Sequence, residues 1–99
     1  MSEKVGNRNR TVLNAAVAVA ESLGFAVFTR SDVAAQAGVA TGSVNNAFGT
    51  MDGLRDAVMA EAIAREMLPL VAQGVAARHP AALAAPPELK ARALASLAA

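Results

Sequence analysis

The sequence predicts an all-α fold, a small helical domain that contains a helix-turn-helix. Apolar residues recur at three- and four-residue intervals, and no segment shows the alternating pattern of a strand. Glycine or proline follows most of these stretches, where helices commonly end. In the segment TRSDVAAQAGVATGSVNNAF, residues 29–48, two short helices meet at a glycine. We therefore expect a three-helix N-terminal bundle followed by two or three further helices.

The first helix is predicted over residues 10–23, with Gly24 as its left-handed end. Its apolar side chains share one face, as an amphipathic helix requires. Before it, residues 1–9 carry more positive than negative charge, and we expect them to form a flexible basic arm. The charged residues near this end are Glu3, Lys4, Arg8 and Arg10.

The second and third helices are predicted from their end signals. Thr29 and Asp32 have the spacing of a capping box, in which each side chain bonds the other residue's backbone N–H. Gly38 ends the second helix after about two turns. The third helix is expected over residues 41–47 and stops at Gly49.

Three more helices are expected in the second half. Thr50 caps a longer helix that Pro69 ends near Leu68, because proline lacks the N–H group and clashes with the preceding turn. A fifth helix is predicted over residues 70–78, and a linker separates it from a final helix over residues 88–97. The predicted division is a basic arm, a helix-turn-helix domain and C-terminal helices, at residues 1–9, 10–67 and 68–99.

The composition limits the class of protein. The chain has 99 residues, a net charge of +1 and no cysteine, so a disulfide framework is excluded. Charged residues interrupt every apolar run before it reaches the length of a membrane span, and we expect a soluble cytoplasmic protein. The alanine-rich faces bury little area per residue, which favours self-association.

The outward face of the third helix is neutral and small. On a helical wheel Val44 and Phe48 share the inner face, whereas Gly42 and Asn46 point almost directly away from them. Such a face suits the DNA major groove, because glycine allows close approach and an asparagine amide can pair with adenine. The candidate base contacts are Thr41, Gly42, Ser43, Asn45 and Asn46.

The stretches RTVLNAAVAVAESLGF and TRSDVAAQAGVATGSVNNAFGTMDGLRDAV together resemble the DNA-binding domain of TetR-family transcriptional repressors. The resemblance covers roughly residues 9–60 and implies that the helix starting near Thr41 is the recognition helix. It also implies phosphate contacts around Thr29 and Arg30. The family's larger C-terminal domain, which binds an inducer and dimerises, has no room in residues 51–99.

The chain departs from the family pattern at three positions. Ala20 stands where an aromatic residue is usual, and Phe28 is expected to fill that space. Thr41 and Asn45 replace the usual basic residue and phosphate-contacting tyrosine, which places more of the affinity on arginine. The expected phosphate contacts are therefore Arg8, Arg10, Thr29 and Arg30.

One such module would bind DNA weakly, so we expect a homodimer that reads an inverted repeat and represses by blocking the promoter. No small-molecule ligand is expected. The alternative for the C-terminal apolar residues is packing within one chain. The candidate interface residues are Leu68, Leu70, Val71, Val75, Leu89, Leu94 and Leu97.

Other chemistry has little support in the sequence. The only histidine, His79, precedes a proline, and no cluster of ligating residues predicts a metal, a cofactor or an enzyme. Two other classes stay open: a protein-interaction module built on a degenerate helix-turn-helix, and a membrane-surface helix. The membrane-surface class is disfavoured, because no predicted helix has a strongly cationic face.

Overall fold

The computed structural model describes residues 2–98, with side chains for residues 9–97. This part of the chain is all helical, as the sequence predicted, and contains no strand. Its helices are α1 (Ser2–Leu23), α2 (Arg30–Ala37), α3 (Thr41–Phe48), α4 (Met51–Ala64), α5 (Leu68–Ala76), α6 (Pro80–Leu83) and α7 (Pro87–Ala98).

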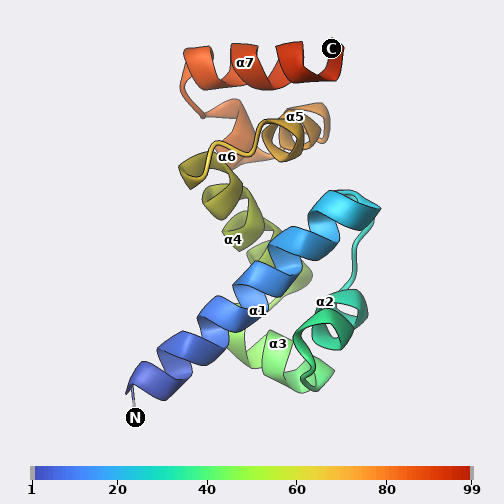
Figure 1. Ribbon diagram of the computed structural model, residues 1–99, viewed down its shortest axis with the longest axis vertical. Helices are drawn as coiled ribbons and strands as arrows, with labels where there is room; N and C mark the ends of the chain where they lie inside the picture. The colour runs from blue at the N-terminus through green and yellow to red at the C-terminus, as the bar shows by residue number, and fades with distance from the viewer. Residues whose placement is uncertain (1, 99) are drawn as a thin grey trace.

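The molecule is elongated, with principal extents of 41 × 25 × 20 Å. Figure 1 shows α1 crossing the molecule beside α4, with α2 and α3 packed near one end of the long axis. Helices α5 and α6 form the next layer, and α7 lies across the opposite end, packed on α5. The helix-turn-helix and α7 are therefore at opposite ends of the chain's long axis.

Helix α1 begins at Ser2, so it includes most of the segment that the sequence analysis assigned to a basic arm over residues 1–9. The helix predicted from Arg10 extends back by two turns. Gly6 disfavours helix by only about 1 kcal/mol relative to alanine, and no proline interrupts this segment. A helix already nucleated further along can propagate through such residues.

One apolar core runs through α1–α5 and reaches α6 and α7. Among the described side chains, every fully buried residue is apolar. Phe25 and Phe28, on the loop between α1 and α2, are both about 1% exposed, which compensates for the small side chains of α1. The largest buried side chains are Phe25, Phe28, Leu54, Met59 and Leu70.

Helix α4 ends at Ala64, four residues before the end predicted at Leu68. The Glu66 N–H donates to the Ile63 carbonyl (3.1 Å) and the Met67 N–H donates to the Ala62 carbonyl (2.8 Å). This is the Schellman pattern, which needs a left-handed residue after the helix, and Glu66 supplies it with φ 53°. The chain turns before it reaches the proline.

Helix α5 also ends in a Schellman pattern, in which Arg78 is the left-handed residue with φ 58°. The His79 N–H donates to the Gly74 carbonyl at 2.9 Å, and the Arg78 N–H donates to the Val75 carbonyl at 3.0 Å. The sequence signal for such a turn is glycine, and neither Glu66 nor Arg78 carries it. Helix α5 also starts at Leu68 rather than Leu70.

A short helix, α6, lies inside the predicted linker. His79 caps it, because its Nδ1 accepts a hydrogen bond from the Ala81 N–H at 3.1 Å. Pro80 takes the first helical position, where its missing N–H costs nothing. Helix α7 starts at Pro87, one residue before the predicted start.

Helix α5 contacts the end of α1 on one side and packs closely against α4 and α6. The Gln73 Oε1 accepts a hydrogen bond from the Phe25 N–H at 2.7 Å, which joins α5 to the end of α1. A Cβ atom added at Gly74 would come within 2.8 Å of the Ala82 Cβ and would meet the Met59 side chain. Glycine at this position is what allows α4, α5 and α6 to pack so closely.

No helix in the described part of the chain combines the length and apolar character needed to cross a bilayer.

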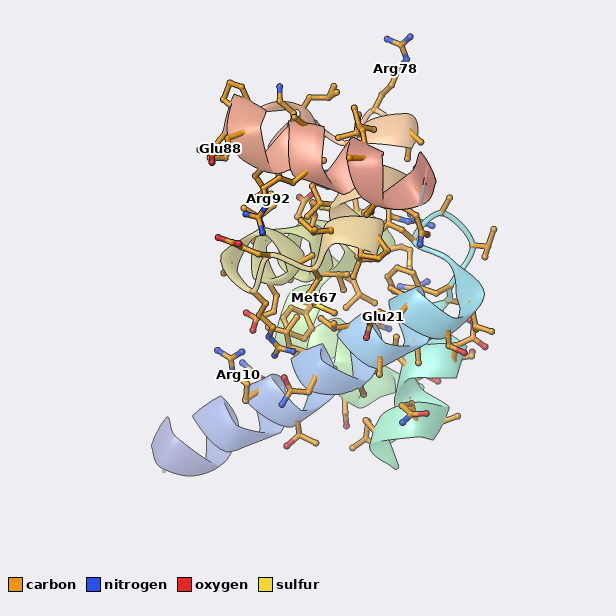
Figure 2. All side chains as sticks on the ribbon, turned by 45° about the horizontal axis from the view of Figure 1, so that its top comes forward. Arg10, Glu21, Met67, Arg78, Glu88 and Arg92 are labelled. Carbon is orange, nitrogen blue, oxygen red and sulfur yellow. The ribbon has the colours of Figure 1, made fainter. Side chains whose placement is uncertain are left out.

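We expect Arg78→Gly to raise the free energy of unfolding by about 1 kcal/mol, because the left-handed conformation strains any residue with a Cβ atom. Arg78 points away from the molecule (Figure 2), so little packing is lost. Urea unfolding measures the change. Arg78→Ala is the matched control: it removes the same side chain but keeps the strain, and an equal gain in both variants would contradict this explanation.

Candidate nucleic-acid interface

The turn between α2 and α3 is fixed by Gly38, which has φ 71°. The Val39 N–H donates to the Ala34 carbonyl at 3.0 Å, completing another Schellman ending. Val39 is partly buried against the core, and Val44 is 1% exposed. Two apolar side chains, one in the turn and one in α3, therefore determine which face of α3 turns inward.

With Val44 inside, the neutral face of α3 is outside. Thr41, Gly42, Asn45 and Asn46 are exposed, and Ser43 is partly buried. A Cβ added at Gly42 would have no neighbour within 4 Å, so this part of the face is flat and open. The structure thus places four of the five candidate base contacts fully on the outward side of α3.

The other end of α3 is set by its contact with α4. The Thr50 Oγ1 accepts a hydrogen bond from the Gly53 N–H at 3.1 Å, as the predicted cap requires. A Cβ added at Gly53 would meet the carbonyl oxygen of Phe48, so the last turn of α3 rests directly on the first turn of α4. Both ends of this short helix are therefore held in place.

Arg30, at the start of α2, reaches across to α3. Its Nη1 donates a hydrogen bond to the Asn45 Oδ1 at 3.0 Å, and the pair is exposed. From the sequence, these two residues are expected in separate roles, Arg30 at a phosphate and Asn45 at a base. Their separation of 15 positions gives no periodic signal that they would meet.

Thr29 and Asp32 form the predicted capping box. The Thr29 N–H and Oγ1 both donate to the Asp32 Oδ2 at 2.9 Å, and the Asp32 N–H donates to the Thr29 Oγ1 at 3.2 Å. The hydroxyl proton of Thr29 is therefore engaged inside the chain, beside a carboxylate. Thr29, which was expected to contact phosphate, therefore caps α2 with its side chain.

Arg10, another expected phosphate contact, forms an ion pair with Glu61 of α4, with 2.9 Å between Nη1 and Oε2. Its side chain remains 57% exposed. Arg65 approaches the same carboxylate oxygen at 2.6 Å and donates to the Asn14 Oδ1 at 2.6 Å, so α1 and α4 are joined through this cluster. Glu61 and Arg65 have the i,i+4 spacing at which opposite charges pair on a helix, whereas the contacts to α1 join residues 51 positions apart. The side chain of Arg8 lies outside the described part of the structure.

The Glu61 carboxyl has a lowered pKa. The hydrogen bond from Arg65 is the main cause, and the charge of Arg10 acts in the same direction. Burial works against them by disfavouring the charged form. Glu61 thus stays ionised and holds both guanidinium groups.

The expected dimer-interface residues divide into three groups by exposure. Leu70, Val71 and Leu89 are buried within the chain, in agreement with the alternative of internal packing. Leu68 and Val75 are partly buried against the core. Leu94 and Leu97, at 48% and 60% exposed, are the members of the set on the open face of α7.

His79 has structural partners at both ring nitrogens. Its Nε2 lies 2.8 Å from the Asp56 Oδ1, its Nδ1 caps α6, and its ring packs edge-on against Phe25 at 5.6 Å between centroids. The sequence shows only that His79 precedes a proline, which predicts neither the contact with Asp56 nor the contact with Phe25. Within the described part of the chain, no three ligating side chains gather as a metal would require.

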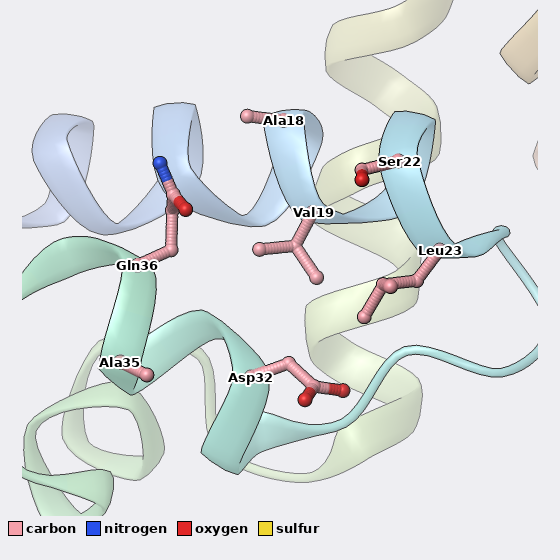
Figure 3. A pocket seen from close by; sticks show the side chains of 7 residues that line it. All are labelled: Ala18, Val19, Ser22, Leu23, Asp32, Ala35 and Gln36. Carbon is pink, nitrogen blue, oxygen red and sulfur yellow. The ribbon is translucent and has the colours of Figure 1, made fainter.

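A groove of about 330 Å³ runs between α1 and α2 (Figure 3). Val19 and Leu23 extend into it from α1, opposite Asp32 and Gln36 of α2. Small side chains complete the lining, which is an open depression on the surface rather than an enclosed cavity.

Residues 12–58 match the family model described as bacterial regulatory proteins, tetR family. The match covers the C-terminal half of α1, the whole helix-turn-helix and the first part of α4. The match includes the Arg30–Asn45 pair and the outward face of α3. No curated protein and no solved structure matches the chain.

The ion pairs of Glu61 make stability depend on pH. Because the folded-state pKa is lowered, this contribution is present above the unfolded-state pKa of about 4.5 and is lost as the pH falls through the folded-state value. We expect the wild type to be more stable than Glu61→Gln at pH 7, and the difference to shrink toward pH 3. Urea unfolding across this pH range measures it, and a difference that stays constant would exclude the ionised carboxylate as its source.

Proposed function

We propose, on the premise that residues 12–58 are a DNA-binding domain of the tetR family, that this chain is a sequence-specific transcriptional repressor. Such domains belong to transcription regulators. In our proposal it binds double-stranded DNA as a homodimer on an inverted repeat. It does so without a small-molecule inducer, a cofactor or an enzymatic activity.

The observation that carries the proposal is the outward face of α3. Gly42, Asn45 and Asn46 are exposed together, while Val44 anchors the opposite side of the helix. A face without bulk or charge allows the backbone to approach the floor of the major groove, and asparagine amides offer donors and acceptors to base edges. A helix exposed only to water usually carries charged side chains instead.

Phosphate contacts would come from Arg30 beside α3 and from Arg10 on α1. Arg30 begins α2 beside α3, and Arg10 is more than half exposed on α1. The N-cap of α3 is Ala40, whose side chain cannot bond the first backbone N–H groups, and the positive end of the helix dipole adds to their attraction for an anion. Together these groups would hold α3 in register on the duplex.

The exposed side of α7 supports the homodimer. Leu94 and Leu97 lie on it, at the end of the long axis opposite the helix-turn-helix (Figure 1). Burying two leucines from each protomer would remove apolar surface from water and would leave both copies of α3 free. A two-fold dimer reads half-sites about 34 Å apart, one helical turn of DNA.

The mode of repression in this proposal is steric. A dimer seated on a promoter occupies the DNA that the polymerase needs. Since the chromosome is its target, the proposal places the protein in the cytoplasm of a bacterial cell. Selection of bound sites from a random DNA pool, followed by gel shifts at two salt concentrations, tests this function. Selected inverted repeats with a steep salt dependence support it.

Asn46→Ala is expected to reduce base discrimination at one position of each half-site by about 1–3 kcal/mol, because an amide that pairs with a base edge is lost. Arg10→Ala is the matched control, which should weaken all sequences alike and flatten the salt dependence. Competition gel shifts with single-base variants of the selected site measure both effects. If Asn46→Ala leaves the base preference unchanged, Asn46 does not contact a base edge.

Replacing Leu94 and Leu97 together by glutamate is expected to convert the dimer to monomer, since each new carboxylate would lose its hydration in the interface. Sedimentation velocity measures the mass, and affinity for the two-half operator should fall far more than affinity for one half-site. Val27→Glu is the control, because Val27 is 65% exposed at the turn after α1. A dimer that survives the double substitution would place the interface elsewhere.

The alternative function, a module that binds a partner protein through a degenerate helix-turn-helix, predicts a different result. No DNA would be retained even at low salt, and no sequence would be enriched in the selection. That outcome would leave the fold unchanged and would reassign the neutral face of α3 to a protein surface.

A further inference from the structure

We infer that Arg30 orients the amide of Asn45 so that the two residues act as one donor unit directed at the acceptors of guanine. This inference rests on the proposed function and concerns which base is read. It assigns Asn45 and Asn46, neighbours on the same exposed face, to different bases.

The orientation of the Asn45 amide follows from its partner. A guanidinium group carries five N–H donors and no acceptor, so the amide atom 3.0 Å from the Arg30 Nη1 has to be the oxygen. The oxygen therefore faces α2, and the amide NH₂ group is the end directed away from Arg30. No comparable partner is found for the Asn46 side chain among the described residues, so that amide can rotate to suit its base.

The bases differ in what they offer to such a unit. Adenine presents an acceptor at N7 and a donor at its N6 amino group, whereas guanine presents acceptors at both N7 and O6. At Asn45, the adenine amino group would have to approach an oxygen already bonded to a cation whose remaining N–H groups also donate. Guanine instead meets donors only, from the amide and from the rest of the guanidinium.

The position of Arg30 adds to the argument. It is the first residue of α2, immediately after the Thr29 cap, so its backbone is held by the capping box. Asn45 is held because Val44, its neighbour in α3, is buried. The two ends of the hydrogen bond are thus fixed by separate parts of the fold, which limits the conformational entropy lost when a base is bound.

Random-pool selection with the full chain tests the inference, using wild type, Asn45→Ala, Arg30→Ala and the double variant. The position at which Asn45→Ala loses its preference identifies the base facing Asn45. We expect guanine there in the wild type, favoured roughly tenfold over adenine. Arg30→Ala should weaken or reverse that preference at the same position, and the double variant should match Asn45→Ala, since the two residues act as a unit.

Arg10→Ala is the control for loss of positive charge. Arg10 is paired with Glu61 rather than with α3, so its removal should lower affinity for every sequence without changing any base preference. If Arg30→Ala behaves in this same uniform way, Arg30 contacts only phosphate and the inference fails. Adenine at the Asn45 position of the wild type would overturn it equally.

The two levels of failure can be told apart. A wild type that enriches no sequence contradicts the proposed function itself. A wild type that enriches an inverted repeat, combined with unaltered preferences in Asn45→Ala, leaves the proposed function standing and removes Asn45 from base readout.

Discussion

The direction in which α3 faces depends on the burial of Val44. An eight-residue helix cannot be stable in water by itself, so tertiary contacts have to hold it. Val44 packs into the core, the left-handed turn at Gly38 sets the entry of the helix, and the contact between Phe48 and Gly53 sets its exit. These three features, at Val44, at Gly38 and between Phe48 and Gly53, orient α3 so that its polar side faces outward.

The local signals in the sequence predicted most of the helices and their caps. Thr29, Thr50 and Gly38 act through neighbours three to five positions away, and such interactions can be read from spacing. The ends at Glu66 and Arg78 could not be predicted in this way, because glycine is the residue that signals a left-handed ending and neither residue is glycine.

The outward position of Asn46 on α3 could be predicted, because a single buried face fixes the opposite one. The partners of Arg30 and Arg10 could not, because each contact joins different helices and depends on how those helices cross. The sequence likewise could not distinguish buried from exposed leucines near the C-terminus, because their burial depends on how α7 packs against α5. Their separation into buried Leu89 and exposed Leu94 needed the register of α7 on α5.

The contacts of Phe25 with the C-terminal layer bear on how the chain folds. Its N–H is bonded to Gln73, and its ring packs against His79, so the closing turn of α1 is completed by residues that lie beyond the family match. Met59 is likewise covered by the helix that contains Gly74. In a fragment cut after residue 58, the Phe25 N–H would lose its acceptor and the Phe25 ring would lose its contact with His79. We therefore expect residues 12–58 to be less stable alone than within this chain. The stability of the segment that presents α3 therefore depends on contacts from the C-terminal helices.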